Sequence, residues 1–221
     1  MSIIAIAGRM GSGKNTVGDI IQKICLTNEG PIFEQKAFAG KLKQMASLLT
    51  GIPVEEFENP ETKKLILGEE WGTVRHNPLN DIEPFAKFQF NELMSVREFL
   101  QKLGTDAVRD GLHKDAWVNA LFADYKSTND CQQHADGLFY TDEHGENEVI
   151  PEYPNWIITD MRFPNEMEAI VKRGGITIKV IRPVEKSKTT ARLHPSETSL
   201  DHAKFDYEII NDGSIEDLVE K

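Results

Sequence analysis

Residues with the spacing of a phosphate-binding loop lie close to the N-terminus. The segment Gly8-Arg9-Met10-Gly11-Ser12-Gly13-Lys14-Asn15-Thr16 follows the short apolar run from Ile3 to Ala7, and a helical pattern comes directly after it. A β-branched apolar run of this length predicts a buried strand. Strand, glycine-rich turn and helix in that order direct backbone N–H groups and the positive end of a helix toward phosphate. The spacing from Gly8 to Lys14 is that of a Walker A loop, in which the lysine reaches the β- and γ-phosphates.

The residue after the lysine departs from the general Walker A pattern. That pattern has Ser or Thr there to hold Mg²⁺, whereas this chain has Asn15 and places Thr16 one residue later. A neutral amide is a poorer metal ligand, so we expect the ion to keep more of its waters or to find other support. The order Gly-Lys-x-Thr resembles the loop of nucleoside monophosphate kinases. The alternative is a glycine-rich turn that only connects a strand to a helix.

Length and composition describe an acidic globular protein. The 221 residues fit a single domain, 1–221, and the formal net charge is −11. This charge argues against a nucleic-acid polymer or an anionic membrane surface as the main partner. Cys25 and Cys131 are too few for a disulfide framework, and no Cys/His spacing indicates a zinc site. We find neither a signal segment nor an apolar run of membrane-spanning length, so we expect a cytoplasmic protein.

The hydrophobic pattern predicts an α/β fold. Five strands connected by helices imply a five-stranded parallel sheet with helices on both faces, and ligands bind beyond the carboxyl ends of such strands. The predicted strand ends carry Gly8, Ala39-Gly40, Asp160-Met161-Arg162 and Arg182. The predicted strands span 3–7, 32–39, 156–159, 176–181 and 207–210, and the predicted helices span 14–26, 41–49, 96–110, 115–125 and 166–173, with a closing helix after 214.

Three segments lack a regular pattern. The stretch 55–95 mixes Pro, Gly, Asn and acids with aromatic residues, which predicts a mobile, substrate-covering flap. The stretch 127–155 is polar and acidic, and we interpret it as a surface insertion with a small hairpin at 139–150. The basic loop 182–200 follows the fourth predicted strand.

A polar stripe on the helix 96–110 suits a phosphate-bearing ligand that also carries a base. Arg97, Gln101, Gly104 and Thr105 recur at helical spacing beside the apolar face. They supply a cation, an amide, a close approach to the backbone and a hydroxyl. An ordinary solvated helix edge is the alternative. Trp117, near the start of the next helix, is either a core residue or a platform for a base.

Asp160 at the end of a predicted strand is placed as a Walker B-type acid that supports Mg²⁺ directly or through water. The alternative is a carboxylate that caps the next helix. Met161 stands where a hydrolase commonly has a water-orienting acid, and no Asn-Lys-x-Asp run for guanine is present. Both features favour a transferase. Because a monophosphate is already an anionic nucleophile, Arg97, Arg109 and Arg162 favour it over a hydroxyl as the acceptor.

On these residues the chain resembles the phage-type deoxynucleoside monophosphate kinases, a branch of the P-loop nucleoside monophosphate kinase superfamily. The resemblance spans nearly the whole length. Its motifs are the segments 8–16, Phe38-Ala39-Gly40-Lys41-Leu42-Lys43, 97–106, Trp117-Val118-Asn119, 159–166, His194-Pro195-Ser196-Glu197 and Asn211-Asp212-Gly213-Ser214. It implies a three-layer P-loop kinase fold with a flap and a short lid. It also implies ATP-dependent conversion of deoxynucleoside monophosphates to diphosphates with Mg²⁺, in a host-cell cytoplasm, by a chain that can form a homodimer.

Together, the residues and the resemblance predict the following site. Lys14, Asp160 and Arg162 are catalytic; Gly11, Ser12, Gly13, Lys14, Asn15 and Thr16 bind the ATP phosphates; Asn15, Thr16 and Asp160 hold the metal directly or through water; Lys41, Arg97, Gln101, Gly104, Thr105, Arg109, Trp117, Asp160, Arg162 and Glu166 bind the acceptor; and Arg182, Lys186, Lys188 and Arg192 are lid candidates.

Two alternatives remain open. A kinase of the dephospho-coenzyme-A-kinase type, or another small-metabolite kinase, would use a hydroxyl acceptor with Asp160 as the base. A non-catalytic P-loop protein would bind ATP without transfer, and it would leave the stripe from Arg97 to Thr105 without a task.

Overall fold

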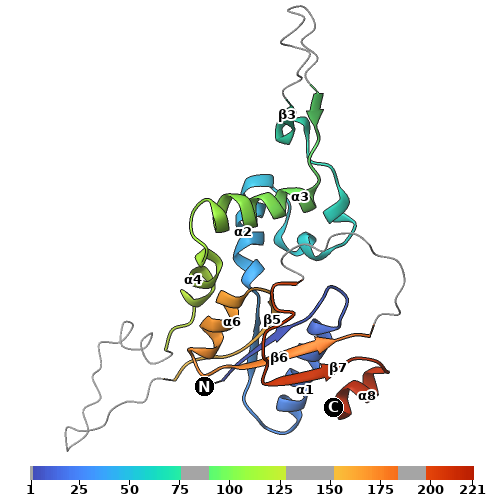
Figure 1. The fold of residues 1–221 in the computed structure, drawn as a ribbon, viewed down its shortest axis with the longest axis vertical. Helices are drawn as coiled ribbons and strands as arrows, with labels where there is room; N and C mark the ends of the chain where they lie inside the picture. The colour runs from blue at the N-terminus through green and yellow to red at the C-terminus, as the bar shows by residue number, and fades with distance from the viewer. Residues whose placement is uncertain (1, 76–89, 128–151, 184–197) are drawn as a thin grey trace, which may run out of the picture. The chain divides into compact units, whose positions relative to one another are not determined.

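The structure is a computed structural model that describes residues 2–75, 90–127, 152–183 and 198–221. The chain divides into two compact units (Figure 1). The first comprises residues 1–40 and 117–221, and the second comprises residues 41–116. The predicted flap, 55–95, falls entirely inside the second unit.

A five-stranded, all-parallel sheet forms the centre of the first unit, which confirms the predicted α/β architecture. The spatial order β2-β5-β1-β6-β7 puts β1 in the middle, between β5 and β6. Ligands bind such sheets where the strand order reverses, at the carboxyl ends of the strands. The strands are β1 (Ile3–Ala7), β2 (Phe33–Lys36), β5 (Asn155–Met161), β6 (Ile176–Ile181) and β7 (Tyr207–Ile210).

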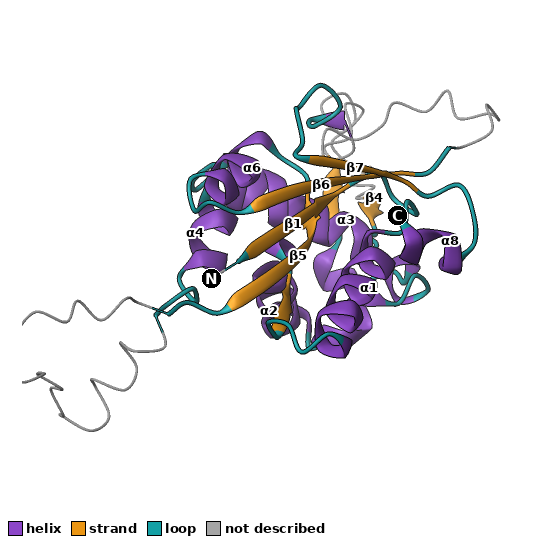
Figure 2. Ribbon diagram, turned by 90° about the horizontal axis from the view of Figure 1, so that it is seen from below, coloured by secondary structure: helices purple, strands orange, loops and turns teal. Residues whose placement is uncertain are grey.

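Helices cover both faces of this sheet, as Figure 2 shows. Helices α1 (Lys14–Thr27) and α8 (Ile215–Glu220) lie on one side, and α4 (Ala116–Phe122) and α6 (Pro164–Val171) lie on the other. Helix α4 is shorter than the predicted helix 115–125. Helix α6 begins and ends two residues before the predicted helix 166–173. All four helices bury an apolar side against the strands.

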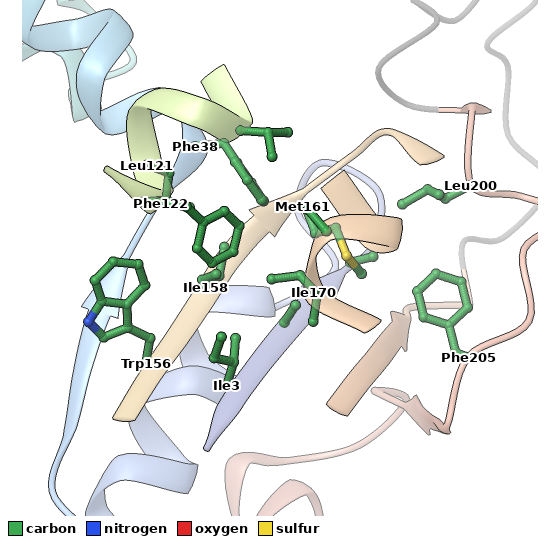
Figure 3. Packing of buried hydrophobic residues seen from close by; sticks show 14 residues of the cluster. Ile3, Phe38, Leu121, Phe122, Trp156, Ile158, Met161, Ile170, Leu200 and Phe205 are labelled. Atoms are coloured by element: carbon green, nitrogen blue, oxygen red, sulfur yellow. The ribbon is translucent and has the colours of Figure 1, made fainter. Parts of the chain in front are cut away.

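Alternation along the central strands builds two cores. Successive side chains of a strand point to opposite faces, so Ile3, Ala5 and Ala7 join one cluster while Ile6 joins the other. Figure 3 shows the first cluster, in which Trp156 and Phe122 stack with ring centroids 6.1 Å apart. Because β1 is covered on both sides, almost its whole length is apolar, as expected for a parallel strand.

Helix α2 (Phe38–Thr50) begins three residues before the predicted start at Lys41. The backbone N–H groups of Phe38 and Ala39 donate to the two carboxylate oxygens of Asp160, at 2.8 and 2.9 Å. A carboxylate that accepts the first N–H groups of a helix fixes where the helix starts. The prediction that Ala39-Gly40 ends a strand is therefore wrong, because β2 stops at Lys36.

The second unit has its own small core, formed where the sequence pattern was weakest. Trp71 packs edge-on against Phe99, with ring centroids 4.8 Å apart and planes at 80°, and Phe57 is fully buried. The backbone of Leu67 donates to Met94 at 2.9 Å. The first part of the predicted flap is thus tethered by its aromatic residues. It contains the short helices η1 (Val54–Glu58), η2 (Thr62–Lys64) and η3 (Glu69–Trp71), and strands β3 (Thr73–Arg75) and β4 (Phe90–Glu92) pair antiparallel beyond it.

The predicted helix 96–110 is continuous but changes its winding. Helix α3 (Val96–Gln101) is α-helical, and η5 (Lys102–Asp110) is a π-helix. A π-helix bonds residue i to i+5 and is wider than an α-helix. The stripe drawn at α-helical spacing is therefore out of phase beyond Gln101. Ser95 caps this helix, and its backbone N–H donates to the Glu98 carboxylate at 2.8 Å.

Two expectations fall outside the described residues. They are the hairpin at 139–150 and most of the insertion 127–155, of which residues 128–151 are not described. None of the helices in residues 2–75, 90–127, 152–183 and 198–221 has the length and apolar character needed to span a bilayer.

Close packing of α1 on the sheet gives a test of the fold. A Cβ at Gly18 would lie 2.9 Å from Thr159 Cγ2 and 3.4 Å from Ile157 Cγ2, whereas a Cβ at Gly40 meets no atom within 4 Å. We expect Gly18→Val to lower the free energy of unfolding by about 1–3 kcal/mol through overpacking. Gly40→Ala, the control, should leave it unchanged or slightly higher. Urea unfolding measures both, and wild-type stability in Gly18→Val would contradict this packing.

A carboxylate at the start of β7 predicts a pH-dependent part of the stability. The hydroxyl and backbone N–H of Thr177 donate to Asp206 at 2.7 and 2.8 Å, and these bonds hold the pKa of Asp206 below its ordinary value of 3.8. A pKa that is lowered on folding contributes stability above the unfolded value, and this contribution is lost as the pH falls through the folded value. Asp206→Ala should therefore be less stable than wild type at pH 7, and the difference should shrink below about pH 4. A difference that stays constant between pH 7 and pH 3 in urea unfolding would contradict this assignment.

Candidate functional site

The segment 8–13 forms a tight loop between β1 and α1. Its three glycines have positive φ angles, of 155° at Gly8, 75° at Gly11 and 97° at Gly13. The backbone of Ser12 donates to Arg9 at 3.1 Å, which closes the turn. A Cβ at Gly8 would lie 2.5 Å from both Ser12 Oγ and the Val180 carbonyl oxygen, so only glycine fits there.

Helix α1 begins without a side-chain cap. Its N-cap is Gly13 in a left-handed conformation, which supplies no side-chain cap, and the first turn carries no acidic residue. The first N–H groups of a helix need a partner from outside the helix. The helix dipole adds partial positive charge at the same place, so this end of α1 is suited to an anion.

Lys14 folds back over the loop. Its Nζ donates to the carbonyl oxygens of Gly8 and Arg9, each at 2.9 Å. These bonds hold an ammonium group at the same end of α1 as the uncapped amides. A fixed cation beside converging N–H groups is the arrangement that neutralises a phosphate chain.

Ser12 supplies a polar group that the described residues leave unsatisfied. The residue is only 3% exposed, and its Oγ has no hydrogen-bond partner among them. A buried hydroxyl without a partner costs stability unless a ligand completes it. The glycine cradle, the uncapped helix, the ammonium and this hydroxyl together fit the oxygens of a phosphate chain.

Asp160 lies beside the start of the loop, on the neighbouring strand. Met161 pairs with Ala7, the residue before Gly8, so Asp160 reaches the carboxyl edge of the sheet next to β1. Its carboxylate caps α2 by accepting the backbone N–H groups of Phe38 and Ala39. A carboxylate oxygen has two lone pairs, so capping does not exclude contact with a ligand. The catalytic and metal-binding roles of Asp160 stay predictions.

Glu166 has a structural task that the sequence did not reveal. The side chain is 4% exposed, and its carboxylate accepts the backbone N–H groups of Arg162 and Phe163 at 2.6 and 3.0 Å. These bonds start α6 and fix the backbone that carries Arg162. The predicted contact of Glu166 with the acceptor stays a prediction.

Most of the predicted acceptor residues lie in the second unit. Gly104 is buried, and a Cβ there would lie 2.8 Å from Leu42 Cδ2, so this glycine allows η5 to pack against α2. Trp117 is buried in α4 of the first unit. The acceptor site, whose predicted residues fall in both units, stays a prediction. Its members in the second unit are Lys41, Arg97, Gln101, Gly104, Thr105 and Arg109.

The metal-binding and lid roles also stay predictions. Asn15 is exposed and Thr16 half-buried in the first turn of α1. No group of three His, Cys, Asp or Glu side chains suited to a metal occurs among the residues that the structure describes. Arg182 is exposed just after β6, and Lys186, Lys188 and Arg192 lie outside the described residues.

Two contacts to the loop have no local signal in the sequence. Arg9 pairs with Asp201 at 3.0 Å, and the Asn211 side chain donates to the Ser12 carbonyl oxygen at 2.9 Å. Both join segments almost 200 residues apart, which no local pattern reveals. Asn211 belongs to the motif Asn211-Asp212-Gly213-Ser214, to which the sequence assigns no role.

The fold and this loop define the class of protein, an α/β protein of the P-loop kinase type. A family model described as deoxynucleotide monophosphate kinase matches residues 54–221. The chain belongs to this family and is a phosphotransferase. The matched region begins after the loop, so the loop geometry and the family match rest on different residues.

Three relatives carry similar descriptions. A "putative deoxynucleotide monophosphate kinase" of Acanthamoeba polyphaga mimivirus is 27% identical over 226 residues, which cover 99% of this chain and 92% of the relative. The "deoxynucleoside-5'-monophosphate kinase" of Escherichia phage T5 is 22% identical over 250 residues, with 95% and 89% covered. The "deoxynucleotide monophosphate kinase" of Enterobacteria phage T4 is 34% identical over 127 residues, with 58% and 43% covered.

Asp160 can be tested for its two roles at once. Asp160→Ala should lower the free energy of unfolding by about 0.5–2 kcal/mol through loss of the α2 cap. We also expect it to abolish phosphoryl transfer. Asp206→Ala is the matched control, because it too removes a carboxylate that accepts a backbone N–H, but at the start of β7. Urea unfolding and ADP formation are measured for both variants. If Asp160→Ala keeps its activity, the carboxylate only holds α2.

Proposed function

We propose that this chain transfers the γ-phosphoryl group of ATP to a deoxynucleoside 5′-monophosphate. A phosphate oxygen of the acceptor attacks the γ-phosphorus, the bond to the bridging oxygen breaks, and ADP and the deoxynucleoside diphosphate leave. The observation that carries the donor half is the uncapped N-terminus of α1, with Lys14 and the unsatisfied Ser12 hydroxyl beside it. The family assignment supports the acceptor half.

The loop binds and orients the donor in this proposal. Phosphoryl transfer needs mainly positioning and charge neutralisation, which fixed N–H groups and an ammonium supply without reorganising. Lys14 contacts the β- and γ-phosphates, and the Ser12 hydroxyl completes its hydrogen bonding on a phosphate oxygen. The chain of phosphates replaces the missing cap of α1.

The donor set also suits Mg²⁺ carried with the nucleotide. Thr16 in the first turn of α1 and Asp160 at the end of β5 would hold the ion or its waters, with Asn15 beside them. When bound, Mg²⁺ neutralises charge that develops on the phosphates. It prefers oxygen ligands and keeps several waters, so few protein ligands suffice.

Cations hold the acceptor in this proposal. A monophosphate has a second pKa near 6 and is anionic at pH 7, so it requires neutralisation rather than a general base. Arg162 at the edge of the sheet and Arg97 and Arg109 in the second unit supply that charge. Gln101, Thr105 and Trp117 contact the nucleoside. A homodimer and a cytoplasmic location remain predictions.

The test is a panel of acceptors, assayed with wild type, with one variant in the loop and with one variant at the edge of the sheet. We expect ADP to form from ATP and Mg²⁺ only when a deoxynucleoside monophosphate is added. Lys14→Ala and Arg162→Ala should each lower kcat/KM by at least about 100-fold, since each removes a charge that acts on transferring phosphate. Lys172→Ala, which removes an exposed lysine paired with Glu168, should match wild type.

Ribonucleoside monophosphates and hydroxyl metabolites serve as controls in the same assay. Transfer to a hydroxyl metabolite, without transfer to any monophosphate, would support the small-metabolite kinase instead. Tight ATP binding with no transfer to any acceptor would support the non-catalytic alternative.

A further inference from the structure

The side chain of Asn211 reaches the phosphate-binding loop from the far end of the chain. Its Nδ2 donates to the carbonyl oxygen of Ser12 at 2.9 Å. Its backbone N–H donates to Ile181 at 2.7 Å and continues the pairing of β7 with β6. The backbone of Asn211 is therefore held by the sheet.

Holding the Ser12 carbonyl also fixes the next N–H group. The described residues contain no cis peptide bond, so the carbonyl of Ser12 and the N–H of Gly13 point in opposite directions across one rigid plane. While the carbonyl bonds to Asn211, that plane cannot rotate without breaking the bond. Gly13 is the N-cap of α1, so the bond sets the direction of an amide at the anion-binding end of the helix.

Asn211 and Gly13 also fit each other by shape. A Cβ at Gly13 would lie 2.5 Å from Asn211 Nδ2, and the φ angle of 97° disfavours any other residue. The absence of a side chain at Gly13 is thus what lets the amide approach the backbone.

The turn that carries Asn211 is braced on both sides. Lys221 Nζ donates to the carbonyl oxygen of Ile210 at 2.7 Å and to Asp212 Oδ1 at 2.5 Å. The hydrogen bond and charge of Lys221 lower the pKa of Asp212, so this carboxyl is ionised at neutral pH. Ser214 caps α8 just beyond the turn by accepting from the backbone of Asp217 at 3.2 Å. These bonds give Asn211 a fixed base.

We propose that Asn211 is a positioning residue of the donor site, which orients the Ser12–Gly13 peptide so that the Gly13 N–H is directed at a phosphate of ATP. The inference rests on the proposed function, because that function assigns the loop a nucleoside triphosphate as its ligand. Asn211 itself acts through the backbone and does not need to contact the nucleotide.

Two substitutions separate donation from packing. Asn211→Ala removes the side chain, and Asn211→Asp keeps its shape but replaces the donating amide with a carboxylate that faces the Ser12 carbonyl. Asn155→Ala is the matched control, because Asn155 Nδ2 also donates to a backbone carbonyl, that of Ile32, at 3.4 Å. Asn155 is the first residue of β5, at the end of the strand away from Asp160. The dissociation constants of ATP and of an accepted monophosphate are measured by calorimetry, together with thermal unfolding.

We expect both Asn211 variants to weaken ATP binding by roughly tenfold, the usual effect of losing one well-placed hydrogen bond. Asn211→Asp should be at least as weak as Asn211→Ala. Monophosphate affinity should stay at the wild-type value in both, and Asn155→Ala should leave both affinities unchanged.

Three results would overturn the inference. If wild type binds ATP and both Asn211 variants bind it equally well, the amide does not position the loop. If ATP and monophosphate affinities fall together, Asn211 has only a general structural role. If wild type does not bind ATP, the proposed function fails, and this inference fails with it.

Discussion

A phosphate-binding loop must keep several amide groups unpaired and aimed at one point, and this constraint governs the first unit. A chain that leaves N–H groups unsatisfied is unstable by itself, so the surrounding structure has to hold it. Here the support comes from distant segments. The Val180 carbonyl lies under Gly8, Asn211 holds the Ser12 carbonyl, and Asp201 pairs with Arg9. Residues in the last third of the chain therefore support a loop that lies within its first sixteen residues.

Two acidic residues at the same edge of the sheet bind the N-termini of helices. Carboxylates near a phosphate chain repel it, yet Asp160 and Glu166 both lie at or just after the end of β5. Each accepts two backbone N–H groups at the start of a helix, Asp160 at α2 and Glu166 at α6. Helix N-termini offset part of the negative charge. In this protein, whose net charge is −11, these helix N-termini therefore offset part of the negative charge at the edge where the proposed phosphate site lies.

Local patterns were sufficient for most of the fold. The apolar runs at 3–7, 176–181 and 207–210 are strands with the expected bounds, and the sheet is parallel as predicted. The misplaced boundaries have tertiary causes. Asp160, 122 residues away, starts α2 at Phe38. The π winding of η5 shifts the stripe that began at Arg97, and periodicity read at 3.6 residues per turn cannot register such a change.

The sequence by itself determined the loop, its lysine and the class of fold, because glycine spacing and strand periodicity are local properties. It also indicated that Asp160 is important, although it did not predict that Asp160 caps α2. Only the tertiary structure decided what the loop rests on and which polar groups are already occupied. Glu166 binds backbone N–H groups, the buried Ser12 hydroxyl has no partner among the described residues, and the Asn211 side chain donates to the loop. The physical reason is that a hydrogen bond between residues 199 positions apart depends on strand order, which no single segment encodes.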